Sequence, residues 1–382
     1  MFEEELKGLK RKGLLRYIIS RASPQGPSIT LNGKKYINFS SNDYLGFANR
    51  TEIIEAAIKA LQRYGVGAGS SRLLAGGSDL HKRLEERISQ FKSVESSVLF
   101  NSGYAANTGI IPSLASDGDV ILSDELNHAS IVDGCRLSKA KTVVYRHGDM
   151  FHLQKLMKTE KARRKIVVTD SVFSMDGDIA PLKEIGELCK RYDSLLYVDD
   201  AHGTGVLGNG RGALAHFGMR PEPWIIQMGT FSKALGSFGA FAAGSRDVIE
   251  WIYNTSRSLI FSTALPCCLI AASLSAILLI EKDSAPIKKL WDNRERLIKG
   301  IRDAGYDILG SETPIIRLKA GDIKKTLRLS HFLSENGIYA AAIRPPSVRE
   351  PRIRITVSAA HTKRHLHLLI EALKRSKKTR SN

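Results

Sequence analysis

Cysteine is scarce in this chain, which has four cysteines among 382 residues and neither a Cys-x-x-Cys pair nor zinc-ligand spacing. Such a composition excludes a small disulfide-stapled domain and is typical of a protein in a reducing compartment, so we expect a cytoplasmic location. Long apolar runs are also missing. The longest, residues 265–280, is interrupted by polar residues and cysteines and is shorter than the ~20 residues that span a bilayer. We expect a buried helix there and no membrane partner.

Acidic residues are few relative to basic ones, with 39 Asp and Glu against 57 Lys and Arg, a net charge of +18. This excess attracts polyanions such as nucleic acids, acidic membranes, phosphorylated ligands or acidic proteins, and alone it selects none of them. A basic nucleic-acid-binding module is one interpretation of the charge. The sequence contains neither a nucleic-acid-binding motif nor interleaved basic and aromatic residues, so we expect no nucleic-acid partner.

Three segments differ in their hydrophobic pattern. Residues 1–45 predict an N-terminal arm, with an amphipathic helix over 3–19 and a hairpin that turns at Asn32-Gly33. Residues 46–270 alternate short apolar runs with helical stretches, which predicts a large α/β domain with a mostly parallel sheet covered on both faces. Residues 271–382 predict a small α+β domain in the order helix, strand, helix, strand, strand, helix. The strands of the large domain are expected at 97–100, 119–122, 141–145, 165–169, 194–198, 224–228 and 240–243.

Ionisable residues follow one of these apolar runs, at Asp199, Asp200 and His202. Parallel α/β sheets bind ligands at the carboxyl ends of their strands, although acidic residues there also serve as plain turn formers. The next residues, 203–208, match the dinucleotide pattern Gly-x-Gly-x-x-Gly. Because the loop-forming residues 209–212 follow where that motif needs a helix, we reject a nicotinamide site.

Lys233 lies among glycines and small hydroxyl residues in segment 229–239. A lysine held beside a ligand can form a Schiff base with a carbonyl, whereas the alternative is an ordinary surface lysine. Pyridoxal phosphate chemistry needs such a lysine, an acid that keeps the ring nitrogen protonated, and a phosphate cradle at a helix start. Lys233, Asp199 and the turn Asn101-Ser102-Gly103 before a predicted helix together meet these needs.

Several ordered segments carry a resemblance to a known family: 38–46, 69–72, 101–107, 124–130, 172–178, 199–205, 230–233 and 261–266. The chain resembles the α-oxoamine synthases, which are fold-type I pyridoxal-phosphate enzymes, over essentially its whole length. Within that family it is most similar to the members of biotin biosynthesis, which condense L-alanine with a pimeloyl thioester. Segments 257–263, 343–348 and 358–361 carry this finer resemblance.

The resemblance implies how the cofactor, pyridoxal 5'-phosphate, would be held. Lys233 would carry it and later act as the base at the substrate Cα, and Asp199 would pair with the pyridine nitrogen. His202, assisted by Ser174, would bond the phenolic oxygen, and His128 would lie over the ring face. The phosphate would be held by Gly103, Tyr104 and Thr230, with Ser262 and Thr263 supplied across the interface of a homodimer.

The resemblance also implies the substrate contacts. Arg354 would bind the carboxylate of alanine with help from Asn42, with Arg352 as the alternative arginine, and Arg16 and Ser347 would line the acyl-thioester side. The acyl carrier, coenzyme A or acyl carrier protein, stays open. A sister synthase that uses glycine or serine is the alternative function. His361, His365 and His367 lack carboxylate or thiolate neighbours in sequence, so we expect no metal site.

Overall fold

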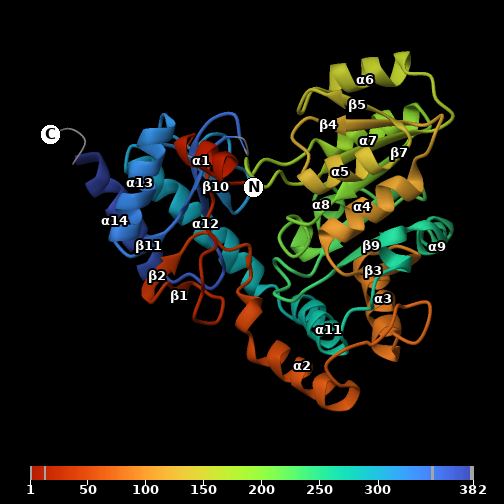
Figure 1. The fold of residues 1–382 in the computed structure, drawn as a ribbon, viewed down its shortest axis with the longest axis horizontal. Helices are drawn as coiled ribbons and strands as arrows, with labels where there is room; N and C mark the ends of the chain where they lie inside the picture. The colour runs from red at the N-terminus through yellow and green to blue at the C-terminus, as the bar shows by residue number, and fades with distance from the viewer. Residues whose placement is uncertain (1, 13, 346–347, 379–382) are drawn as a thin grey trace.

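A seven-stranded sheet forms the centre of the protein. The computed structural model describes residues 2–12, 14–345 and 348–378 (Figure 1). The strands lie in the order β3-β9-β8-β7-β6-β4-β5, and all neighbours run parallel except where β9 pairs. This confirms the expected mostly parallel sheet. The strands are β3 (Ser96–Phe100), β4 (Val120–Asp124), β5 (Lys141–Tyr145), β6 (Lys165–Asp170), β7 (Leu195–Asp199), β8 (Ile225–Thr230) and β9 (Ala240–Gly244).

Both faces of this sheet are buried. Along β6, Ile166 and Val168 belong to one hydrophobic cluster and Val167 to another, because successive side chains of a strand point to opposite faces. The continuous apolar runs of the sequence have this origin. Helices that flank the sheet and close its ends are α2 (Thr51–Tyr64), α3 (Asp79–Lys92), α4 (Gly103–Leu114), α5 (Ala129–Leu137), α6 (Met150–Thr159), α7 (Leu182–Arg191), α8 (Ala213–His216), α9 (Arg246–Thr255), α10 (Arg257–Ile260) and α11 (Cys267–Lys282).

A second group of elements combines both ends of the chain (Figure 1). The hairpin β1 (Ser28–Leu31) and β2 (Lys34–Asn38) turns at Asn32 and Gly33, whose φ values of 48° and 79° suit a tight hairpin turn, as expected. β2 also pairs in parallel with β11 (Ile338–Tyr339). The remaining elements are β10 (Ile315–Lys319), β12 (Ala341–Ile343), β13 (Arg352–Thr356), α12 (Ala285–Asp303), α13 (Ile323–Glu335) and α14 (Lys363–Lys378). The domain boundaries expected near residues 45 and 270 stay predictions.

Two local expectations were wrong. The helix expected over 3–19 is α1 (Glu3–Arg11) and ends early. The glycine at position 13 in the sequence disfavours a longer helix by roughly 1 kcal/mol, and the apolar residues that follow it find no buried face. Between α13 and α14 the structure has three strands instead of the expected two. The extra strand, β11, has only two residues, which is too short to produce a hydrophobic period.

The turn after β7 is held by a buried ion pair. Lys92 Nζ lies 2.8 Å from Asp200 Oδ2 and also donates to the Thr204 hydroxyl and the Arg211 carbonyl. Asp200 accepts a further bond from the Ser171 hydroxyl at 2.8 Å. Because the charges are paired and hydrogen-bonded, their burial is tolerated. Gly208–Gly210 form a single turn of 3-10 helix, so the dinucleotide-like segment opens no long helix.

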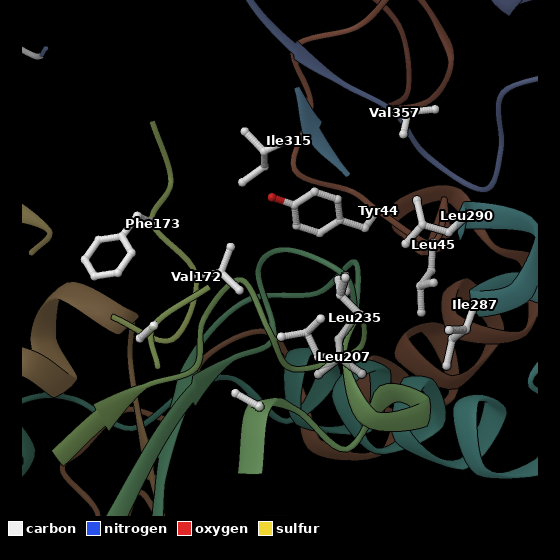
Figure 2. Packing of buried hydrophobic residues seen from close by; sticks show 14 of the residues in the cluster. Tyr44, Leu45, Val172, Phe173, Leu207, Leu235, Ile287, Leu290, Ile315 and Val357 are labelled. Carbon is white, nitrogen blue, oxygen red and sulfur yellow. The ribbon is translucent and has the colours of Figure 1, made fainter. Parts of the chain in front are cut away.

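Side chains from distant parts of the sequence meet above the sheet (Figure 2). Val172 and Phe173 follow β6, Tyr44 precedes α2, and Ile315 belongs to β10; all are members of one buried cluster. The sheet and the C-terminal elements therefore share a continuous core. In the described part of the chain, every helix is too short or too polar to cross a membrane. The apolar run 265–280 lies in α11, as expected, where Ile270 and Ile277 are buried.

Candidate active site

Three neighbouring strands end in polar residues at one edge of the sheet. β6 ends at Asp170, β7 at Asp199 and β8 at Thr230. Asp170 and Asp199 are register partners on the paired strands β6 and β7. The carboxyl edge of a parallel sheet is where α/β proteins bind ligands, and the sequence analysis placed the site here.

Asp199 is buried, and each of its carboxyl oxygens accepts one hydrogen bond. Its Oδ2 accepts a bond from Asn107 Nδ2 at 2.7 Å, and its Oδ1 accepts one from the backbone N–H of Ala201 at 2.9 Å. Burial raises the pKa of this carboxyl, whereas the charge of Lys233 and the bond from Asn107 act to lower it. A cation placed against Asp199 would therefore stabilise its ionised form.

Lys233 lies in the turn that follows β8. Its side chain is half-buried, and burial lowers the pKa of its amine, opposed by the charges of Asp199 and Asp170. The turn is closed by the N–H of Gly236, which donates to the Lys233 carbonyl at 3.0 Å. Gly236 has φ 63°, and a Cβ there would lie 2.3 Å from the backbone nitrogen of Ala48, so only glycine fits. A lysine with a lowered pKa is a better nucleophile and proton acceptor.

His202 is buried and contacts Tyr44. The distance between the Tyr44 hydroxyl and His202 Nδ1 is 2.7 Å. Burial raises the pKa of Tyr44 to about 12, and burial lowers the pKa of His202 well below its usual value. A protonated tyrosine can donate to the neutral imidazole, which then carries its own proton on Nε2. His202 can thus offer a neutral N–H to a ligand.

His128 connects the sheet edge to α5. It is the N-cap residue of that helix, and its Nδ1 lies 2.7 Å from the Ser130 hydroxyl. Its backbone N–H donates to Asp170 Oδ2 at 2.7 Å. Burial lowers the pKa of His128, and burial together with the charge of Asp199 raises that of Asp170 well above its usual value. Burial therefore favours the neutral form of the His128 ring.

The expected phosphate residues lie at two places. Gly103 begins α4, whose N-cap Ser102 accepts a bond from the N–H of Ala105 at 3.1 Å. Thr230 donates its hydroxyl proton to the Gly239 carbonyl at 2.8 Å. The Tyr104 side chain is exposed and its hydroxyl bonds Asp133, so it contributes its backbone rather than its ring to the helix start.

Ser262 and Thr263 lie beside the segment that leads into α4. Asn101 Nδ2 donates to the Thr263 carbonyl at 2.9 Å within the same chain. Together with Arg72 and His81, the two hydroxyl residues line a narrow cavity. The structure thus brings them close to the helix start through a backbone contact, and their expected contact with a partner's phosphate stays a prediction.

Two arginines of β13 differ in their surroundings. Arg354 donates from Nε to the Ser174 carbonyl at 2.7 Å and from Nη2 to Asn42 Oδ1 at 3.1 Å. Arg352 instead forms an ion pair with Asp176, with Nη1 2.5 Å from Oδ1. Both arginines are buried, but among the described residues no ion pair includes Arg354. This difference favours Arg354 for binding an anionic ligand.

Arg16 lies on the wall of a cavity of about 540 Å³ between the N-terminal arm and the C-terminal elements. Leu14, Tyr339 and Ile343 contribute apolar surface, and Arg344 contributes a second guanidinium to the lining. Arg16 therefore lies in a cavity with a mixed polar and apolar lining, and its expected place on the acyl-thioester side stays a prediction. Ser347 lies outside the described residues.

Comparisons with known proteins identify the family. The aminotransferase class I and II family matches residues 34–373. The chain belongs to this family. Among curated relatives, an 8-amino-7-oxononanoate synthase of Geobacter metallireducens is 48% identical over 96% of this chain and 95% of its own. One of Thermoanaerobacter pseudethanolicus is 44% identical over 98% of this chain and 95% of its own.

Solved structures of this aminotransferase family share the fold. A Sphingomonas wittichii serine palmitoyltransferase has a TM-score of 0.93 and 31% identity, covering 99% of this chain and 97% of its own. An 8-amino-7-oxononanoate synthase of Francisella tularensis has a TM-score of 0.78 and 26% identity, covering 91% of this chain and 99% of its own. Another neighbour, at 28% identity, is a serine palmitoyltransferase with its PLP bound. The expected fold class and the pyridoxal phosphate cofactor are confirmed.

Sequence reasoning assigned no role to two residues that support the site of this aminotransferase-family chain. Asn107 bonds Asp199, and Tyr44 bonds His202. Asn107 is a buried amide in a mostly apolar helix, and such a residue signals a polar partner in the core. Tyr44 gave no comparable signal, because its partner lies 158 positions away.

The C-terminal histidines serve packing and backbone contacts. His361 is buried, stacks on Phe39 with ring centroids 4.4 Å apart, and its Nδ1 accepts the N–H of Ser358 at 2.9 Å. His365 lies at the start of α14, where its Nδ1 accepts the N–H of Thr362 at 3.3 Å. Within the described ranges, no group of three or more His, Cys, Asp or Glu is arranged to hold a metal ion.

Proposed function

We propose that this protein condenses L-alanine with a pimeloyl thioester to give 8-amino-7-oxononanoate, CO2 and the free thiol carrier, a step of biotin biosynthesis. The observation that carries the proposal is the full-length identity of 44–48% to relatives named for this activity. That name does not specify whether coenzyme A or acyl carrier protein delivers the acyl chain. The reducing-compartment composition supports action in the cytoplasm.

The residues at the sheet edge fit pyridoxal phosphate. Asp199 is a buried carboxyl that a cation would keep ionised, and a protonated pyridine nitrogen is such a cation. The start of α4 at Gly103 offers free backbone N–H groups for a phosphate. Neutral His128 can lie against an aromatic ring without an opposing charge. When bound, the cofactor supplies an electron sink that stabilises negative charge at the amino-acid Cα.

Three side chains of the protein would each have a distinct role toward the cofactor. Lys233 would hold the cofactor through Nζ, and the same amine would be the group that accepts the Cα proton of the amino acid, for which its lowered pKa suits it. The Nε2–H of His202, whose ring is fixed by Tyr44, would hold the phenolic oxygen of the cofactor, and we propose the assistance of Ser174 from the resemblance alone. Asp199, held in place by Asn107, would keep the ring nitrogen protonated, because a carboxylate stabilises a cation beside it.

Arg354 is the proposed binding group for the alanine carboxylate. Its Nε and Nη2 are already oriented by Ser174 and Asn42, and its buried charge has no carboxylate partner within the described residues. A guanidinium in this state gains from a bidentate carboxylate. Arg16 and the partly apolar cavity around it would take the acyl thioester, a role we also propose for Ser347 from the resemblance alone.

A homodimer is part of the proposal. Segment 66–74 lies against segment 261–264, because Ser71 bridges Thr263 and the N–H of Ala264 donates to Ser70. The two segments together expose large apolar side chains, with Val66 76%, Leu74 81% and Phe261 70% exposed. Such clustered apolar exposure is typical of an interface. Its position next to Ser262 and Thr263 supports their contribution to a partner's site.

We also propose the division of the chain into an N-terminal arm (1–45), a large domain (46–270) and a small domain (271–382). The hairpin of the arm pairs with β11 of the C-terminal segment. The arm would therefore move with the small domain in any relative motion of the domains.

A sister synthase is the second candidate, because the structures with TM-score 0.93 are serine palmitoyltransferases. One experiment separates the candidates. Purified holoenzyme is mixed with alanine, glycine or serine, and the cofactor spectrum is recorded. The amino-ketone product is then followed with pimeloyl-CoA, pimeloyl-carrier protein, a short-chain acyl-CoA and a long-chain acyl-CoA. Product from alanine alone supports the proposal. Product from serine with a long-chain acyl thioester, or from glycine with a short one, would replace it.

A further inference from the structure

A second ionic cluster lies outside the site described so far. His147 follows β5, and its ring lies between two carboxylates: Nδ1 is 3.0 Å from Asp124 Oδ1, and Nε2 is 2.8 Å from Asp178 Oδ2. A neutral imidazole has one N–H, so two carboxylate contacts require the doubly protonated ring. Burial opposes this charge, but the bonds to Asp124 and Asp178 prevail and raise the pKa of His147 to about 10.

The two carboxylates belong to different structural units. Asp124 ends β4 and is fixed further, because its Oδ1 also accepts the N–H of Leu126 at 2.9 Å. Asp178 belongs to the loop 171–180, which joins β6 to α7. His147 packs edge-on against Phe173 of the same loop, with ring centroids 4.4 Å apart. His147 therefore fastens the loop to the edge of the sheet.

The loop is internally rigid. The N–H of Phe173 donates to the Asp178 carbonyl at 3.1 Å, and the N–H of Gly177 donates to the Phe173 carbonyl at 2.7 Å. Val172 and Ile179 form a bridge at its base. Because residues 172–179 form one compact unit, a displacement at Asp178 is passed to the residues at the tip.

The tip of the loop holds the arginines of β13. The Ser174 carbonyl accepts from Arg354 Nε at 2.7 Å, and Asp176 accepts from Arg352 at 2.5 Å. Arg354 Nε therefore takes its direction from a carbonyl whose position depends on the loop. The path from His147 to Arg354 runs through Asp178 and Ser174, and each step is a hydrogen bond or the rigid loop itself.

We propose that His147 is a positioning residue for the amino-acid carboxylate: by clamping Asp178 to Asp124 it holds loop 171–180 and, through the Ser174 carbonyl, the guanidinium of Arg354. This inference rests on the proposed function, in which Arg354 binds that carboxylate. His147 acts through the loop and takes no part in the chemical step. Amino-acid binding should therefore depend on it, and turnover at saturating amino acid should not.

The test uses His147→Gln, which removes the charge and keeps a polar side chain. The amino-acid Kd is measured from the change in cofactor absorbance when holoenzyme is titrated with alanine. We expect this Kd to rise about tenfold, the size typical of removing a group that orients a ligand-binding residue. The kcat at saturating alanine and the KM for the thioester should stay within about twofold of wild type.

Three further variants sharpen the result. Asp178→Asn should raise the alanine Kd by a similar factor. The double variant His147→Gln with Asp178→Asn should have a Kd no higher than that of the single variant that binds alanine less tightly, because both substitutions remove the same contact between His147 and Asp178. His147→Lys keeps a positive charge between the carboxylates and should bind alanine more tightly than His147→Gln does. The matched control is His331→Gln, since His331 is an exposed histidine of α13 that lies 3.4 Å from Glu335. It should match wild type.

An unchanged alanine Kd in both His147→Gln and Asp178→Asn overturns the inference. So does an equal loss for alanine and for the thioester, which a general loss of structure would give. If His147→Gln fails to fold, Asp178→Asn and His147→Lys decide in its place. A wild-type holoenzyme that responds to none of alanine, glycine and serine contradicts the proposed function and removes this inference with it, a result distinct from the others.

Discussion

Asn107 connects Asp199 to Tyr197: its Nδ2 donates to Asp199 Oδ2 at 2.7 Å, and its Oδ1 accepts the Tyr197 hydroxyl at 2.5 Å. All three side chains are buried. Asn107→Leu keeps the approximate volume but removes the hydrogen bonds that Asn107 makes to Asp199 Oδ2 and to the Tyr197 hydroxyl. We expect a loss of about 1–3 kcal/mol in the free energy of unfolding and at least a tenfold loss of kcat/KM. Urea unfolding and steady-state kinetics measure both, and wild-type values would contradict this role for Asn107.

Lys233→Ala should abolish turnover and the visible absorbance of the cofactor bound through this lysine. The fold should stay intact, because Lys233 is half-buried in a turn whose bonds are made by backbone groups. Absorbance spectra, activity and circular dichroism test this directly. Normal absorbance and activity in Lys233→Ala would show that another group carries the cofactor.

Arg354→Lys and Arg352→Lys should have different effects. Replacing Arg354 removes the bidentate geometry, so the KM for alanine should rise about 10- to 100-fold. Arg352 pairs with Asp176, so its replacement should mainly lower stability. Kinetics with alanine as the varied substrate and thermal unfolding distinguish the two. If Arg352→Lys alone raises the KM for alanine, the assignment of the two arginines is reversed.

The contribution of His147 to stability should depend on pH. The pKa of His147 rises on folding from its ordinary value of 6.5 to about 10, so the folded state binds the proton more tightly. The contribution is complete below pH 6.5 and is lost as the pH rises toward 10. The difference in Tm between wild type and His147→Gln should therefore shrink over this interval. A difference that grows with pH would contradict the sign of the effect.

Ionic strength should affect the two substrates unequally. Residues 285–382 carry 22 Lys and Arg against 9 Asp and Glu, whereas residues 46–284 carry 27 against 26. Most of the excess positive charge thus belongs to residues 285–382, which also contribute Arg344 to the cavity beside Arg16. An anionic acyl carrier would be attracted there, and salt screens such attraction over about 8 Å at physiological strength.

We therefore expect kcat/KM for the thioester to fall as salt increases, while the value for alanine barely changes. A salt series with both substrates measures this. Parallel curves would leave the charge with a role in solubility alone.

The sequence predicted those features that depend on residues close together in the chain. All seven strands of the main sheet lie where apolar runs indicated, because burial on both faces leaves a continuous apolar signal. Asp199 and Lys233 could be found because each lies at or just after the end of such an apolar run. The contact of Arg354 with Asn42 could be expected only from the family resemblance, since 312 positions separate them. The clamp at His147 and the bond from Tyr44 to His202 had no local signal at all.

The pairing of β2 with β11 has a consequence for biosynthesis. Ile37 leaves the ribosome early, whereas its partner Ile338 is made near the end of translation. The main sheet, whose strands all lie between residues 96 and 244, can assemble while the chain is still growing. The hairpin must wait with one edge unpaired until β11 emerges. A chain that stalls before residue 338 would therefore carry a formed central sheet and an open strand edge, the kind of intermediate that chaperones bind and that aggregates when they are absent.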